Sequence, residues 1–240
     1  MSSDSIDIIN AFALLTNFVI LPALSYGSQL ALGALAVTLV YSVLRFSNFA
    51  QGDSMAFGTM IVILLTGFMI NQGWTISGIP TALLVIPVAI IGTAIYLLSM
   101  DRLVYKFYRR VKAKSITIVM ASIGVMFVTG GLVRFILGPR PQIFADGERF
   151  IFSVREFKAF TGLEQGIALK TSQFLTVTIA ILLVAFLFYF LQKTKTGKAM
   201  RAYSDNEELA LLSGINPDKV VQVTWLLVAG LTTKIGRAHV

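Results

Sequence analysis

The sequence contains no cysteine, a single histidine, and charged residues at only 13% of its 240 positions. The lack of cysteine excludes disulfides, thiolate catalysis and cysteine metal sites. A soluble domain carries about twice this share of charged residues. In their place stand long uncharged stretches, 37 residues from Ile8 to Leu44 and 47 from Ser54 to Met100. Repeated apolar runs of this length predict an all-α fold, a polytopic transmembrane helical bundle.

Turn signals divide these stretches into six complete spans and the start of a seventh. Pro22 and the Asn71-Gln72-Gly73 turn mark the two internal divisions. The predicted spans cover residues 7–25, 28–44, 53–71, 79–100, 115–133 and 171–192. A seventh begins at Val220 but has only 14 uncharged residues before Lys234, where about 20 are needed to cross the hydrocarbon.

We therefore expect one transmembrane domain over residues 1–233, incomplete at its C-terminal end. The last residues, 234–240, do not continue the apolar pattern. Their Ile-Gly-Arg-Ala-His-Val sequence is also what a common sequencing-adapter DNA would encode. We expect them to be a non-native tail.

The net charge of +8 comes from short basic segments between spans, which membrane topology and anionic lipid explain better than nucleic acid. Residues 101–114 contain six basic residues, and Lys193–Arg201 contains four. Two spans separate these clusters, so both are expected on the cytoplasmic side. Counting back four spans places the N-terminus there too. Residues 134–170 balance six basic residues with four acids and are expected on the opposite face.

A polar break separates the two long apolar stretches. Polar groups at such a place are costly in lipid unless protein or a water-filled cavity receives them. A helix starting near Asp53 would also direct the positive end of its dipole at the break. We hypothesise that the break lines a translocation path, with the candidates Asn48, Phe49, Gln51, Gly52 and Asp53. The alternative is that these residues cap and position the third span. Ala50, Ser54 and Gly58, spaced by four, predict close helix packing.

The polar segment 193–219 has its own helix signals. Ser204 and Glu207 have the spacing of a capping box, with Ser204 as the N-cap. Gly214 can end the helix in the left-handed conformation, and Pro217 prevents its continuation. These signals predict a short cytoplasmic helix over residues 204–213. An ordinary solvated turn is the alternative.

Three stretches together resemble the LivH-type permeases, the membrane subunits of ABC importers for branched-chain amino acids. Arg45-Phe46-Ser47-Asn48-Phe49-Ala50-Gln51-Gly52-Asp53 is similar to the Asn-Phe-Ala-His-Gly-(Asp/Glu) signature of that family. Ala121-Ser122-Ile123-Gly124 resembles a small-residue motif of its middle span. Thr196–Ala202 followed by Ala210–Asn216 resembles its cytoplasmic loop. The resemblance extends to about Gly230. Gln51 stands where the family usually has histidine, which weakens any proposal of proton chemistry there.

The resemblance implies a permease that pairs with a homologous permease, two ATPase subunits and a periplasmic substrate-binding protein, in membrane lipid and without nucleic acid. The inner membrane of a bacterial cell is the implied location. ATP hydrolysis would occur in the partners, so the chain is not expected to be an enzyme or to hold a cofactor. The implied ATPase-coupling residues are Gly197, Lys198, Arg201, Ala202, Glu207, Ala210, Gly214 and Ile215.

Other function classes fit the sequence less well. It contains no His-Glu-x-x-His, no Gly-x-Ser-x-Gly and no acidic pair within the spans, so an intramembrane enzyme has no catalytic set. An ATP-independent channel or secondary transporter gives no reason for the cytoplasmic helix. A membrane scaffold gives none for the polar break. A urea or amide ABC permease remains an alternative, because the related urea permeases share these motifs.

Overall fold

The computed structural model describes residues 3–74, 81–138, 150–152 and 168–233. The predicted all-α class is confirmed, and the chain is a multi-pass membrane protein. Within the described residues, five helices are long and apolar enough to cross a membrane: Ile9–Leu44, Gln51–Asn71, Leu83–Arg110, Ser115–Leu137 and Thr171–Lys193. The predicted tail 234–240 and most of the 134–170 loop lie outside the described residues.

The described chain forms two compact units. The first lies within Met1–Ala31 and Gly147–Leu182, and the second within Leu32–Asp146 and Leu183–Val240. In the first unit, α1 (Ser3–Leu15), the π-helical turn η1 (Thr16–Ile20) and the start of α2 (Leu21–Leu44) follow one another without interruption. The predicted division at Pro22 is therefore wrong, and the first two predicted spans are one continuous helix.

The π turn explains how the helix accommodates proline. Pro22 has no backbone N–H, and its ring crowds the carbonyl of the preceding turn. Directly before it, the N–H of Leu21 bonds to the carbonyl of Thr16, one residue further back than in an α-helix. The wider π turn makes room for the proline ring, so the helix continues through Pro22. Three membrane-length helices, ending at Arg110, cover the stretch where four spans were predicted. The count therefore no longer assigns the N-terminus to the cytoplasmic side.

The first unit also contains two short strands, which the sequence did not predict. β1 (Phe150–Phe152) pairs antiparallel with β2 (Leu169–Lys170) immediately before α8 (Thr171–Lys193). The side-chain oxygen of Asn17 accepts a hydrogen bond from the Ala168 N–H at 3.3 Å. This bond ties the strand pair to the π turn.

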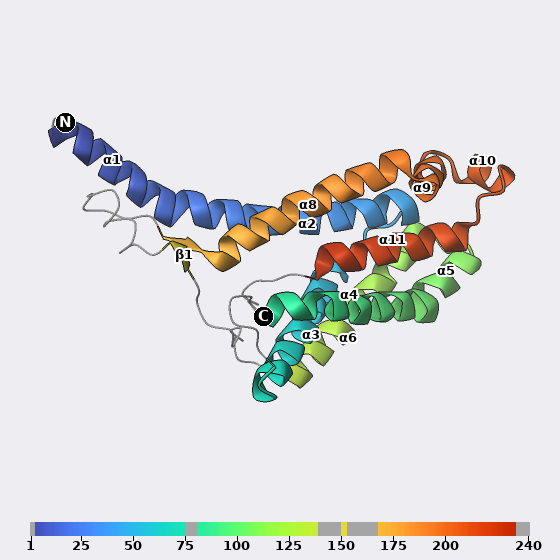
Figure 1. Ribbon diagram of the computed structural model, residues 1–240. Helices are drawn as coiled ribbons and strands as arrows, with labels where there is room; N and C mark the ends of the chain where they lie inside the picture. The colour runs from blue at the N-terminus through green and yellow to red at the C-terminus, as the bar shows by residue number, and fades with distance from the viewer. Residues whose placement is uncertain (1–2, 75–80, 139–149, 153–167, 234–240) are drawn as a thin grey trace. The chain divides into compact units, whose positions relative to one another are not determined.

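The second unit is a helical core built from segments far apart in the sequence. α3 (Gln51–Asn71) packs against α4 (Thr81–Met100) and α6 (Ser115–Leu137), and α11 (Pro217–Thr232) packs against α4 (Figure 1). α4 continues through the π turn η2 (Asp101–Tyr105) into α5 (Lys106–Arg110). Most of the boundaries predicted from charge and turn signals lie close to those observed.

Small residues allow the close packing of α3. Ala50, Ser54 and Gly58 are all buried. A β-carbon at Gly58 would lie 3.1 Å from the Thr93 hydroxyl oxygen and 3.5 Å from that of Thr233. The predicted small-residue ridge therefore faces α4 and the end of α11.

The polar segment folds as two helices, α9 (Lys195–Asp205) and α10 (Glu207–Leu212). The predicted N-cap was wrong. Asn206 caps α10, and its side-chain oxygen accepts from the Leu209 N–H at 3.0 Å. Ser204 lies in the last turn of α9, where its hydroxyl donates to the Ser42 carbonyl at 3.0 Å. A long-range partner thus removes Ser204 from the capping box.

Candidate functional site

The polar break is a tight turn between α2 and α3. After α2 ends at Leu44, Arg45 adopts a left-handed conformation with φ of 59°. The side-chain oxygen of Asn48 accepts two hydrogen bonds, one from the Ala50 N–H at 3.2 Å and one from the Tyr105 hydroxyl at 3.0 Å. Asn48 is itself buried. These bonds fix the entry into α3 and join it to η2.

The other predicted path residues differ in exposure. Gln51 is only 2% exposed, and neither of its amide atoms has a hydrogen-bond partner among the residues that the structure describes. Phe49 and Gly52 are exposed, and Asp53 is half-buried. The Phe49 N–H donates to the Ser122 hydroxyl at 3.2 Å, so the small-residue motif of α6 directly supports the break.

The Asp53 carboxylate faces α6. A β-carbon at Gly130 would lie 3.1 Å from an Asp53 carboxylate oxygen. Glycine at this position therefore leaves the space that the carboxylate occupies. A carboxylate within a membrane helix is a functional candidate, because burying one in lipid is costly. In the described part of the chain, no three histidine or acidic side chains gather as metal ligands.

A buried ion pair beside the break was missed in the sequence. Asp101 is 4% exposed and accepts hydrogen bonds from Arg109 at 2.6 and 2.9 Å. It also accepts one from the Trp225 indole N–H at 2.9 Å. A signal was available, because Asp101 is the single acid at the start of a segment with six basic residues.

Aromatic rings connect this ion pair to the break. The Tyr105 ring stacks on that of Trp225 with centroids 5.8 Å apart and contacts that of Phe46 at 5.2 Å. All three residues are almost fully buried. Through Tyr105, which also bonds to Asn48, the break is joined to α11.

The corner between α8 and α9 requires glycine. A β-carbon at Gly197 would lie 2.7 Å from the Leu191 α-carbon and 2.9 Å from the Leu191 carbonyl oxygen, and closer still to the Phe190 carbonyl. These are backbone atoms, which cannot rotate away. The Gly197 N–H also donates to the Thr194 hydroxyl at 2.9 Å, which caps α9.

α10 presents an apolar surface that the described chain leaves uncovered. Leu209, Leu211 and Leu212 are exposed, Leu212 to 85%. Ala210, in contrast, is buried. The helix ends as predicted, with Gly214 at φ of +79°. The N–H groups of Gly214 and Ile215 donate to the carbonyls of Leu211 and Ala210, each at 3.0 Å, in the geometry of a Schellman motif.

The remaining predicted coupling residues lie around this helix. Lys198, Arg201 and Ala202 are exposed on α9. Glu207 accepts a hydrogen bond from the Tyr203 hydroxyl at 2.8 Å. Burial, followed by this bond to Glu207, raises the pKa of Tyr203 above its ordinary value.

The polar segment and the break are directly bonded to each other. The Arg45 guanidinium donates to the Ser204 carbonyl, which bonds the break to the last turn of α9. Lys106, in the first basic cluster, forms an ion pair with Asp218 of the polar segment at 3.0 Å. Both basic clusters therefore lie at one end of this unit, as the span count between them predicts.

The comparisons with known proteins agree on one family. Residues 19–236 match the family described as branched-chain amino acid transport system / permease component. Over 218 residues the chain is 27% identical to a protein of Salmonella typhimurium named high-affinity branched-chain amino acid transport system permease protein LivH. It is 26% identical over 218 residues to the protein of that name from Escherichia coli K12. Over 215 residues it is 26% identical to a probable branched-chain amino acid transport permease LivH of Methanocaldococcus jannaschii.

These alignments cover 88% of this chain in the first two cases and 89% in the third. The chain spans 66% of the length of the Salmonella and Escherichia relatives and 63% of that of the Methanocaldococcus relative. No solved structure gives a significant match.

Proposed function

Because the chain belongs to the family of branched-chain amino acid transport permease components, we propose that it is the membrane-spanning permease subunit of an ABC importer for branched-chain amino acids. The family match, which extends over most of the chain, carries this proposal. The proposed complex contains a second homologous permease, two ATPase subunits that hydrolyse ATP, and a periplasmic substrate-binding protein. It lies in the inner membrane of a bacterial cell, and the chain itself is not an enzyme.

Within this function, the residues of the break have two roles. Asn48 and Gln51 are buried, so they shape the start of α3. Phe49, Gly52 and Asp53 are accessible and are the residues proposed to line the translocation path. Because an α-amino acid is a zwitterion, the N-terminus of α3 would favour its carboxylate, and Asp53 its ammonium group.

The exposed leucines of α10 support a docking role. A short helix can transmit motion if its apolar side chains insert into a groove on a partner. We propose that Leu209, Leu211 and Leu212 contact the ATPase, with Arg201 and Lys198 near acidic groups on that partner. Ala210 is packed within the chain and therefore holds α10 in place instead of contacting the partner. Gly214 permits the turn that follows.

The transport proposal is tested by expressing the gene of this permease in a host that lacks branched-chain amino acid import, together with genes for a second permease, two ATPases and a binding protein. Uptake of labelled leucine that requires ATP and the binding protein is the expected result. Uptake of labelled urea instead of leucine would assign the alternative substrate. Uptake of either without the ATPase subunits would point to a channel or secondary transporter.

The docking proposal is tested by capture of the ATPase on the affinity-tagged permease. Leu212→Glu should abolish capture without affecting folding, because the side chain makes few contacts within the chain. Gly214→Val should also reduce it, by straining the left-handed turn. Val111→Glu is the matched control, since Val111 is a similarly exposed apolar residue, 57% exposed, after α5. Equal capture by the Leu212 and Val111 variants would contradict the docking role.

A further inference from the structure

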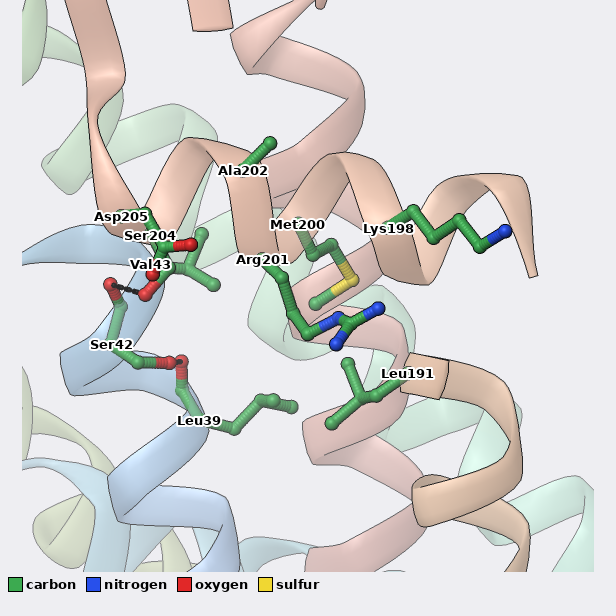
Figure 2. A pocket seen from close by; sticks show the side chains of 10 residues that line it. All are labelled: Leu39, Ser42, Val43, Leu191, Lys198, Met200, Arg201, Ala202, Ser204 and Asp205. Atoms are coloured by element: carbon green, nitrogen blue, oxygen red, sulfur yellow. Dashed lines mark hydrogen bonds between the residues drawn. The ribbon is translucent and has the colours of Figure 1, made fainter. Parts of the chain in front are cut away.

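A cavity of about 640 Å³ lies between the last turns of α2, the end of α8 and α9 (Figure 2). Leu39, Val43 and Leu191 form apolar parts of its wall, and Met200 contributes a thioether. α2 and α8 end here as membrane-length helices. Because a membrane-length helix leaves the hydrocarbon at its end, we expect the cavity at the level of lipid headgroups.

The charged lining of the cavity is mainly basic. Lys198 and Arg201 line it, and Asp205 is the acidic residue among the lining side chains. In Figure 2 the Arg201 side chain extends from α9 toward Leu191, and Asp205 lies at the opposite end of α9 from Lys198. Asp205 follows Lys198 by seven positions of the helix, a rise of about 10 Å. Neither basic side chain forms an ion pair within the described ranges.

α9 has the composition of a helix that lies in the membrane interface. Its buried residues Gly197, Met200 and Tyr203 recur every third position. Lys198 directly follows Gly197, Arg201 directly follows Met200, and both basic residues are exposed. Basic residues directly after a membrane span attract anionic lipid, and this attraction falls off within about a Debye length of the membrane surface.

We propose that this cavity binds an anionic phospholipid. Arg201 and Lys198 hold the phosphate, and the wall of Leu39, Val43 and Leu191 contacts the adjoining acyl chain. Arg201 suits this role because its planar guanidinium can donate two parallel hydrogen bonds to phosphate oxygens. The proposal is independent of the transported substrate and requires only this chain and a membrane. It concerns the chain without its ATPase, because the docking proposal places the same two basic side chains near that partner in the assembled complex.

The experiment is native mass spectrometry of the detergent-purified full chain, titrated with dioleoyl phosphatidylglycerol or dioleoyl phosphatidylcholine. We expect one phosphatidylglycerol to bind at least about tenfold more tightly than phosphatidylcholine. The double variant Lys198→Gln/Arg201→Gln should lose this preference. Lys195→Gln should keep it, since Lys195 is exposed on the same helix and carries the same charge but does not line the cavity.

Three results would overturn the proposal. Equal binding of the two lipids by the unmodified chain would do so without any variant, so a folding defect cannot obscure the test. An equal loss in the Lys195 variant would show that net charge, and not the cavity, attracts lipid. Displacement of phosphatidylglycerol by millimolar inorganic phosphate would assign the basic pair to free phosphate instead of a lipid headgroup.

Discussion

Replacing Gly197 with alanine should destabilise the corner between α8 and α9. The added β-carbon would lie 2.7 Å from the Leu191 α-carbon and 2.9 Å from its carbonyl oxygen. An ordinary van der Waals contact between these atoms is about 3.5 Å or more. α9 must therefore move away from the end of α8 by most of an ångström. The same movement stretches the 2.9 Å bond from the Gly197 N–H to the Thr194 hydroxyl.

The size of the effect follows from three terms. Overpacking against rigid neighbours costs about 1–3 kcal/mol. Loss of an N-cap costs about 1 kcal/mol. The preference of a helix for alanine over glycine returns about 1 kcal/mol. The net loss is about 1–3 kcal/mol. For a chain of this size it corresponds to a thermal midpoint lowered by about 2–12 °C.

The measurement is the thermal unfolding midpoint of the detergent-purified chain, followed by circular dichroism. Gly67→Ala is the matched control, because a β-carbon at Gly67 in α3 would meet no atom of the described residues within 4 Å. That variant should unfold at the same temperature as the unmodified chain or slightly above it. If the Gly197 and Gly67 variants unfold together, the close approach of α9 to α8 does not exist and the reasoning fails.

Three further substitutions test the buried groups around the site. Asp101→Asn should lower the thermal midpoint by the equivalent of about 2–4 kcal/mol, because it leaves the half-buried Arg109 unpaired. Adding Arg109→Leu should restore part of the lost stability. If the double variant restores none of it, the ion pair is excluded as the cause. Gln51→Leu should raise stability by about 1–3 kcal/mol, since it removes a buried amide that has no hydrogen-bond partner among the described residues. A lower thermal midpoint would show that the amide is hydrogen-bonded. The raised pKa of Tyr203 means that the folded state favours its neutral form, so stability should be complete below pH about 10 and fall above it. Tyr203→Phe should lose less stability between pH 9 and 11 than the unmodified chain, and equal losses would contradict this assignment.

Helix ends set by local signals could be predicted from the sequence. α8 was expected over 171–192 and runs from Thr171 to Lys193, because charged residues limit the apolar run at each end. α6 starts at the expected Ser115 but continues past Arg134 to Leu137. A long basic side chain near a helix end can reach the membrane surface, so it does not stop the helix.

Features that depend on a compensating or distant partner could not be predicted. Pro22 is a local break signal, but the π turn ahead of it cancels the effect. Ser204 and Glu207 have the sequence spacing of a capping box, yet the Ser204 hydroxyl bonds to the Ser42 carbonyl, 162 positions away. Asp101 and Trp225 are likewise 124 positions apart. No periodicity within either segment signals such a pair.

The break and the polar segment are two separate features in the sequence, but hydrogen bonds and ring contacts connect them in the structure. Arg45 bonds to the last turn of α9. On the other side, Trp225 of α11 stacks on Tyr105, whose hydroxyl bonds to Asn48. α10 packs against α9 and is followed in the chain by α11, and both of these helices are connected by side-chain contacts to the start of α3. Because packed contacts of this kind shift between discrete arrangements instead of stretching, we expect a displacement of α10 that carries α9 with it to break the bond between Arg45 and Ser204 or to move the break as well.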